Sequence, residues 1–149
     1  MIDQLSLLHQ LFGQLTIPPA VERELTQKHQ RYPNVLAKVQ QSGIVDVLEV
    51  KQTQLRDVLL LDLDSGEAEA LTLAIEHRAA LIILDEVNGR SIAEAQQLLY
   101  TGSIGCLVEA KRRGLLVAIR PHINAMRQQA GFWLRESVYE RILRDTKEW

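Results

Sequence analysis

The chain has 149 residues, a formal net charge of -2 and a sequence isoelectric point near 6.1. Hydrophobic residues make up 46% and charged residues 24% of the chain, as in ordinary globular domains. The single cysteine, Cys106, excludes an internal disulfide and a cysteine zinc cluster, and no apolar run approaches the roughly 18 residues of a membrane span. We therefore expect one globular domain over residues 1–149, in the cytoplasm, with no membrane association.

The first half of the chain alternates helical and strand-like patterns. Apolar residues at helical spacing end at Gly13, a helix-stop residue, and Pro18-Pro19 separates a short strand from the helix after it. Alternation of apolar and polar residues marks a second, half-buried strand. Helices are therefore predicted over residues 2–12, 20–28 and 34–41, and strands over 14–17 and 44–50.

The second half continues the alternation. Asp64 or Ser65 can cap a helix whose first turn holds Glu67 and Glu69, where the positive end of the helix dipole favours acids. The apolar run ALIIL over 80–84 predicts a buried strand, which a Gly-containing turn follows. Further helices are predicted over residues 91–97, 103–113, 122–130 and 136–147.

Short apolar strands that alternate with helices predict an α/β fold, a three-layer α/β/α arrangement around a mostly parallel sheet. Sheets of this type bind ligands beyond the carboxyl ends of their strands. Asp85 and Glu86 stand directly after the strand at 80–84. The sequence therefore directs the search for a functional site to that edge.

Three acids are predicted to meet at this edge. A helix of about 12 residues and a strand of about five bring Glu67 and Asp85 to the same edge, and Glu24, on the helix after the first visible strand, can reach it too. Two unit charges about 4 Å apart repel by about 4 kcal/mol at an effective dielectric constant of 20. Such clusters are relieved by a hard cation such as Mg²⁺, which takes oxygen ligands. The other interpretation, helix-capping acids and solvated loop ends, stays open.

Charge is distributed unevenly along the chain. Residues 1–100 carry 8 Lys+Arg against 14 Asp+Glu, and residues 101–149 carry 9 against 5. An acidic front and a basic back suit a site where metal ions meet a polyanion, although solvated helix faces of different sign give the same pattern. A phosphate-binding loop is not indicated, because GEAEA and TGSIG match neither Gly-rich pattern.

Four motifs, in this order along the chain, resemble those of a known family. They are IPPAVEREL at 17–25, LDSGEAEALTLAIEHRAALIILDEVNGRSIAE at 63–94, TGSIGCLVEAKRRGLL at 101–116 and AGFWLRESVYERIL at 130–143. Together they resemble a PIN-domain-like family of prokaryotic proteins described as predicted nucleic-acid-binding proteins. The resemblance implies an α/β/α fold with a parallel sheet. Active members of the wider superfamily, including the VapC toxins of toxin–antitoxin pairs, are Mg²⁺- or Mn²⁺-dependent ribonucleases.

The resemblance also assigns site residues. The acid after the first strand–helix step falls on Glu24, the acid that opens the middle helix on Glu67, with Glu69 as a neighbouring candidate, and the acid that closes the next strand on Asp85. Relatives often have a second Asp after this position, and here it is Glu86. These acids are the expected catalytic residues and metal ligands. The expected nucleic-acid contacts are Arg90, Lys111, Arg112 and Arg113, of which Arg90 and Lys111 are better explained by structural roles.

One departure from the family pattern concerns the start of the fold. PIN proteins begin with a central strand that ends in Asp, whereas Met1 already lies inside the following helix, and Asp3 is on that helix rather than at a strand end. Loss of a central strand leaves a gap in the sheet and a metal site short of one ligand. Exposed strand edges pair readily with other chains, so we expect a homo-oligomer.

Three hypotheses follow. In the first, the chain is a metal-dependent ribonuclease, or its remnant, in which Glu24, Glu67 and Asp85 hold Mg²⁺ or Mn²⁺ that activates water against an RNA phosphodiester. In the second, it is a catalytically silent PIN-like module that binds nucleic acid or a protein partner, such as an antitoxin-like protein. In the third, it is a non-functional product of a truncated reading frame.

Overall fold

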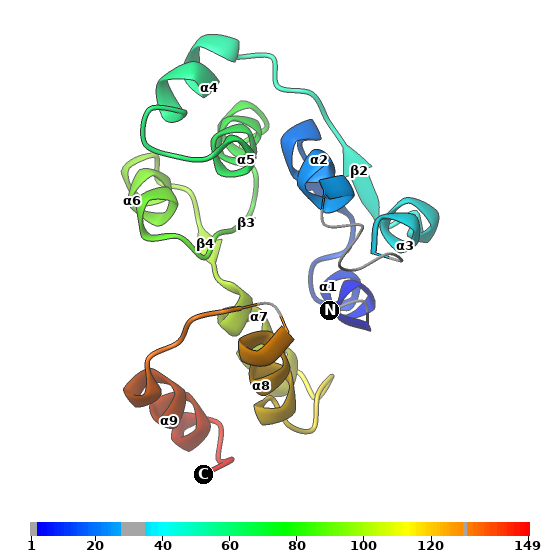
Figure 1. Cartoon of the computed structure of the whole chain (residues 1–149), viewed down its shortest axis with the longest axis vertical. Coiled ribbons are helices and arrows are strands. Elements are labelled where there is room, and N and C mark those ends of the chain that lie inside the picture. The colour runs from blue at the N-terminus through cyan, green and yellow to red at the C-terminus, as the bar shows by residue number, and fades with distance from the viewer. Residues whose placement is uncertain (1–2, 28–34, 130) are drawn as a thin grey trace.

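The structure is a computed structural model that describes residues 3–27, 35–129 and 131–149. Short strands alternate with helices along these residues (Figure 1). In chain order the elements are α1 (Asp3–Phe12), β1 (Leu15–Ile17), α2 (Pro19–Gln27), α3 (Val35–Ser42), β2 (Val45–Val47), α4 (Thr53–Leu59), α5 (Ser65–Glu76), β3 (Ile82–Ile83), α6 (Val87–Ala95), β4 (Tyr100–Thr101), α7 (Ser103–Arg112), α8 (Arg120–Gln129) and α9 (Glu136–Asp145).

The strands form two separate parallel pairs within the described residues. β1 pairs with β2, with Leu15 opposite Val45, and β3 pairs with β4, with Ile82 opposite Tyr100. The two pairs lie apart in Figure 1, with α2 on the side of β2 that faces β3. The predicted α/β class and parallel pairing are confirmed, whereas a single central sheet with a helical layer on each face is not what the described strands form.

Two hydrophobic cores hold the molecule together. The first packs α4, α5 and α6 against β3, with Leu71 and Ala68 fully buried. The second packs α1, α7 and α8 together, with Ile119 and Ile123 fully buried, and α9 contributes Ile142. The two regions are joined because α2 packs on α5 and α1 packs on α7. The contact of α2 with α5 brings the helix that carries Glu24 against the helix that carries Glu67.

Most predicted elements are present, with shifted ends. The strands are shorter than predicted: residues 44–50 give only Val45–Val47 and residues 80–84 only Ile82–Ile83. The helix predicted over 91–97 begins at Val87, because the VNG stretch read as a turn is its first turn. Two elements were not predicted: α4, and the two-residue strand β4 that pairs with β3. A two-residue strand has no alternation to detect, and its partner alone defines it.

Candidate functional site

The N-terminal end of α5 places the first acid. Asp64 is the N-cap: its backbone is extended, and its Oδ1 accepts a 2.9 Å hydrogen bond from the backbone N–H of Glu67. This confirms the predicted cap, and it uses one of the amide hydrogens that a helix start leaves unpaired. Glu67 therefore lies in the first turn of α5, at the positive end of the helix dipole.

Two glycines lie beside Glu24 and Glu67 at this end, and the first of them is required for the close approach of Glu24. The Glu24 carboxylate lies so close to Gly66 that a side chain at position 66 would collide with it. Gly89, in α6, is buried, and a Cβ there would lie 3.6 Å from the Oε1 atom of Glu67. Glu24 of α2 and Glu67 of α5 thus lie beside the same helix start, and Glu67 also reaches the helix that follows Asp85 and Glu86.

We call Glu24, Glu67, Asp85 and Glu86 the acidic rim. The pKa of Glu67 is raised to about 7, first by burial and then by the negative charges of Asp64, Glu86, Glu24 and Asp85. Carboxylates from three segments of the chain are therefore close enough to disfavour ionisation of Glu67. A shift of this kind is frequent at functional sites, although structural charge clusters also produce it.

Asp85 is held in place by the start of α7. Its Oδ1 accepts a 2.8 Å hydrogen bond from the backbone N–H of Ser103, and its Oδ2 accepts one of 2.6 Å from the Ser103 hydroxyl. Arg90 lies 3.8 Å from Asp85, and its Nε donates to the carbonyl of Leu84 at 2.8 Å. Sequence reasoning missed the role of Ser103. The signal was available, because a Gly-Ser pair before an apolar helical stretch marks a helix start.

Glu69, the neighbouring candidate, lies in a different setting. Its carboxylate is buried, and its Oε2 accepts a 2.9 Å hydrogen bond from the backbone N–H of Ala20 in the first turn of α2. Arg23 lies 3.8 Å from its Oε1. Glu69 thus fastens the start of α2 to α5, which fixes the helix that carries Glu24.

The donor chemistry of the acidic rim fits a hard cation. All four side chains offer carboxylate oxygens, the ligands that Mg²⁺ takes, and Mg²⁺ often uses only one or two protein carboxylates and keeps several waters. Within the ranges that the structure describes, no three histidine, cysteine, aspartate or glutamate side chains lie close enough together to hold a metal ion. Glu24, Glu67 and Asp85 share a rim, but they do not form a closed ligand cage.

The basic residues predicted to contact nucleic acid are engaged within the protein. Lys111 donates to Glu148 Oε1 at 2.6 Å, and both Arg112 and Arg113 pair with Glu109 at 2.6 Å. These two arginines hold the pKa of Glu109 at about 2, below its ordinary value. The cations at the end of α7 thus have structural partners, and their contact with a polyanion stays a prediction.

The chain belongs to the PIN domain family, whose family model matches residues 1–148. This match confirms the predicted family, and a PIN domain suggests a nuclease-like module. No curated protein and no solved structure matches the chain. Among the described helices, none is both long and apolar enough to cross a lipid bilayer.

Proposed function

We propose that this PIN-domain protein is a nuclease of the metal-dependent type, which acts on RNA phosphodiesters and binds Mg²⁺ or Mn²⁺ at the acidic rim. The observation that supports the proposal is that carboxylates from three segments of the chain lie near the start of α5. Glu24 lies against Gly66, and Glu24, Asp85 and Glu86 are close enough to Glu67 to raise its pKa. A divalent cation bound there would polarise a phosphodiester and lower the pKa of an attacking water.

The chain's own residues prepare this rim in three ways. The dipole of α5 favours negative charge at Glu67, which opposes the repulsion from Asp64 and the other acidic neighbours. Glu69 fixes the position of α2 and thereby brings Glu24 to Gly66. The carboxylate of Glu69 itself is not part of the rim. Ser103 holds Asp85 in one orientation. Preorganised carboxylates of this kind favour cation binding because little reorganisation is needed.

The direct test is an RNA cleavage assay with Mg²⁺ or Mn²⁺ titrated into the metal-free protein. We expect cleavage that depends on metal concentration, and Asp85→Asn and Glu67→Gln should each abolish it. Asp57→Asn, on α4, is a matched control that removes an exposed carboxylate outside the rim, and its activity should equal that of the wild type. Cleavage that survives Asp85→Asn with unchanged metal dependence would refute the assignment.

A second candidate function is a catalytically silent module that binds RNA or an antitoxin-like protein. The observation that favours it is the absence, in the described part of the chain, of a three-ligand metal group, together with the engagement of both Asp85 oxygens by Ser103. Calorimetric titration separates the two candidates. RNA binding in EDTA without cleavage in Mg²⁺ or Mn²⁺ supports the silent module.

The split sheet also supports a homo-oligomer. Within the described residues, β1 and β3 each have a strand on only one side. The free sides carry unpaired backbone groups, which template pairing with another chain. Light scattering on the purified protein should therefore give a mass of at least twice 16.9 kDa, and a monomer at all concentrations would contradict this part of the proposal.

A further inference from the structure

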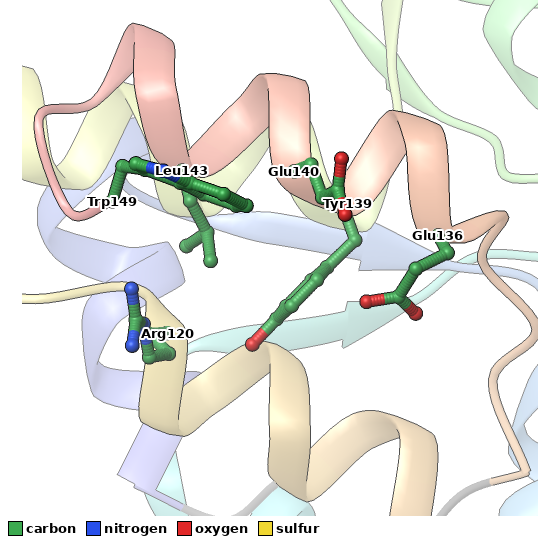
Figure 2. A pocket seen from close by; sticks show the side chains of 6 residues that line it. All are labelled: Arg120, Glu136, Tyr139, Glu140, Leu143 and Trp149. Atoms are coloured by element: carbon green, nitrogen blue, oxygen red, sulfur yellow. The ribbon is translucent and has the colours of Figure 1, made fainter.

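A second polar pocket lies away from the acidic rim, between α8, α9 and the end of the chain. Its volume is about 350 Å³, and it is lined by Arg120, Glu136, Tyr139, Glu140, Leu143 and Trp149. Figure 2 shows Trp149, Tyr139 and Arg120 around one space, with Glu136 beside Tyr139. Pockets of this size accommodate a small ligand or one unit of a polymer.

Both aromatic rings of the pocket are held in place. The Tyr139 hydroxyl donates to Asn124 Oδ1 at 2.8 Å, and the guanidinium of Arg127 lies 4.9 Å from the centre of the ring. The guanidinium of Arg144 lies 4.6 Å from the ring centre of Trp149. Trp149 is nevertheless 66% exposed. Ordered aromatic rings that face solvent offer stacking surfaces at a low entropic cost.

The charges of the pocket favour an anionic group at Arg120. Glu136 is paired with Arg127 at 3.0 Å, and Glu140 lies 3.9 Å from Arg144, so each carboxylate of the pocket has its own cation. In the described contacts the Arg120 guanidinium donates to the backbone carbonyl of Glu148, which carries no charge, whereas the Glu148 carboxylate accepts from the backbone N–H of Arg120 and pairs with Lys111. The charge of Arg120 is thus not neutralised by that carbonyl, and a guanidinium has five N–H donors with a geometry that matches phosphate.

We propose that this pocket binds one nucleotide, with the base against Trp149 and Tyr139 and the phosphate on Arg120. Stacking on aromatic rings combined with phosphate contacts from arginine is the usual chemistry of single-stranded nucleic acid binding. A double helix does not fit, because its bases are stacked on one another and are not available to the rings. The site is distinct from the acidic rim, so nucleotide binding here requires neither a metal nor cleavage.

The two tryptophans of the chain provide the test. Trp133→Phe leaves Trp149 as the only tryptophan, and Trp149→Phe leaves Trp133, which is 76% exposed and does not line the pocket. Each variant is titrated in EDTA with GMP, guanosine, ribose 5-phosphate and a single-stranded RNA oligomer, with excitation where the bases do not absorb. We expect saturable quenching of Trp149 by GMP, no saturable response from Trp133, and about tenfold weaker binding of guanosine and of ribose 5-phosphate.

Arg120→Gln, made in the Trp133→Phe background, should weaken GMP binding about five- to tenfold and leave guanosine binding unchanged. The far-ultraviolet circular dichroism of each variant checks that it is folded. Tighter binding of the oligomer than of GMP assigns the pocket to a nucleic-acid strand, and equal binding assigns it to a free nucleotide. Equal quenching of the two tryptophans, or no response from folded Trp133→Phe protein, would overturn the proposal.

Discussion

The carboxylate of Glu148 binds two helices, α7 and α8, to the segment that follows α9. Its Oε1 accepts hydrogen bonds from Lys111 Nζ at 2.6 Å and from the backbone N–H of Ile119 at 2.7 Å, and its Oε2 accepts one from the backbone N–H of Arg120 at 2.9 Å. The carboxylate is nearly buried, with 10% of the side chain exposed. It caps the start of α8 and ties it to α7 and to the segment after α9.

Replacement by alanine should therefore be costly. A hydrogen bond to a charged group is worth about 1.5–3 kcal/mol, loss of an N-cap about 1 kcal/mol, and loss of one partner of a buried ion pair about 3–5 kcal/mol. These three contributions are not added together, because they describe the same atoms. We expect Glu148→Ala to lower the free energy of unfolding by about 3 kcal/mol, and Glu140→Ala, which breaks an exposed pair, by less than about 0.5 kcal/mol.

The pH dependence of the unfolding free energy tests whether the ionised Glu148 carboxylate causes this stabilisation. Burial raises the pKa of Glu148, but the hydrogen bonds from Lys111, Ile119 and Arg120 outweigh burial and hold the pKa below its ordinary value. A lowered acid pKa stabilises the folded state above the unfolded pKa, near 4.3, and this stabilisation is lost as the pH falls through the folded pKa. Urea unfolding of wild type and Glu148→Ala at pH 7 and below pH 4 measures this. The same difference in unfolding free energy at both pH values would refute the reasoning.

The remaining predictions concern the acidic rim. Because the pKa of Glu67 is raised to about 7, its ionisation opposes folding increasingly as the pH rises from about 4.5 through 7. Glu67→Gln should therefore stabilise the metal-free protein at pH 8, on the order of 1 kcal/mol after allowance for solvent screening, and should not stabilise it at pH 4. Urea unfolding at the two pH values measures the difference. Gly66→Ala should displace the Glu24 carboxylate and weaken Mg²⁺ binding in calorimetric titration, with little loss of stability because a flexible side chain can move; unchanged affinity would remove Glu24 from the site. Ser103→Ala removes one of the two hydrogen bonds that Ser103 donates to Asp85. Since a lost hydrogen bond costs about 1 kcal/mol, the midpoint of thermal unfolding should fall by a few degrees. A midpoint equal to that of the wild type would contradict this contact.

Local signals in the sequence were sufficient for most of the helices, although not for α4. The Asp64 cap, the stop at Gly13 and the apolar spacing of α1 depend on residues within a few positions of each other, so they can be read from a single stretch. The ends of α1, α2 and α9 consequently fall close to their predicted positions. The first turn of α6 was misread because the VNG stretch resembles a turn, although in the structure Gly89 is the position where α6 passes Leu84 and Glu67.

Partners distant in the sequence could not be read in this way. Ser103 is separated from Asp85 by 18 positions, Ala20 from Glu69 by 49, and Lys111 from Glu148 by 37. Glu69 and Glu67 look equivalent in the sequence, and only the packing of α2 on α5 gives one a structural partner and leaves the other among acids. Of the basic run at 111–113, Lys111 has a partner that lies far away in the sequence, and contact of this run with a polyanion stays a prediction.

The sequence by itself determined the α/β class, the order of the helices and the acids at the helix and strand ends, because hydrophobic period, caps and helix stops act over one or two turns. Only the tertiary structure decided that the strands form two separate pairs, that Ser103 holds Asp85, and that Trp149 closes a pocket with Arg120 and Tyr139. These features arise where chain segments far apart in the sequence pack together. No local pattern specifies which of many compatible partners a strand edge or a carboxylate will meet.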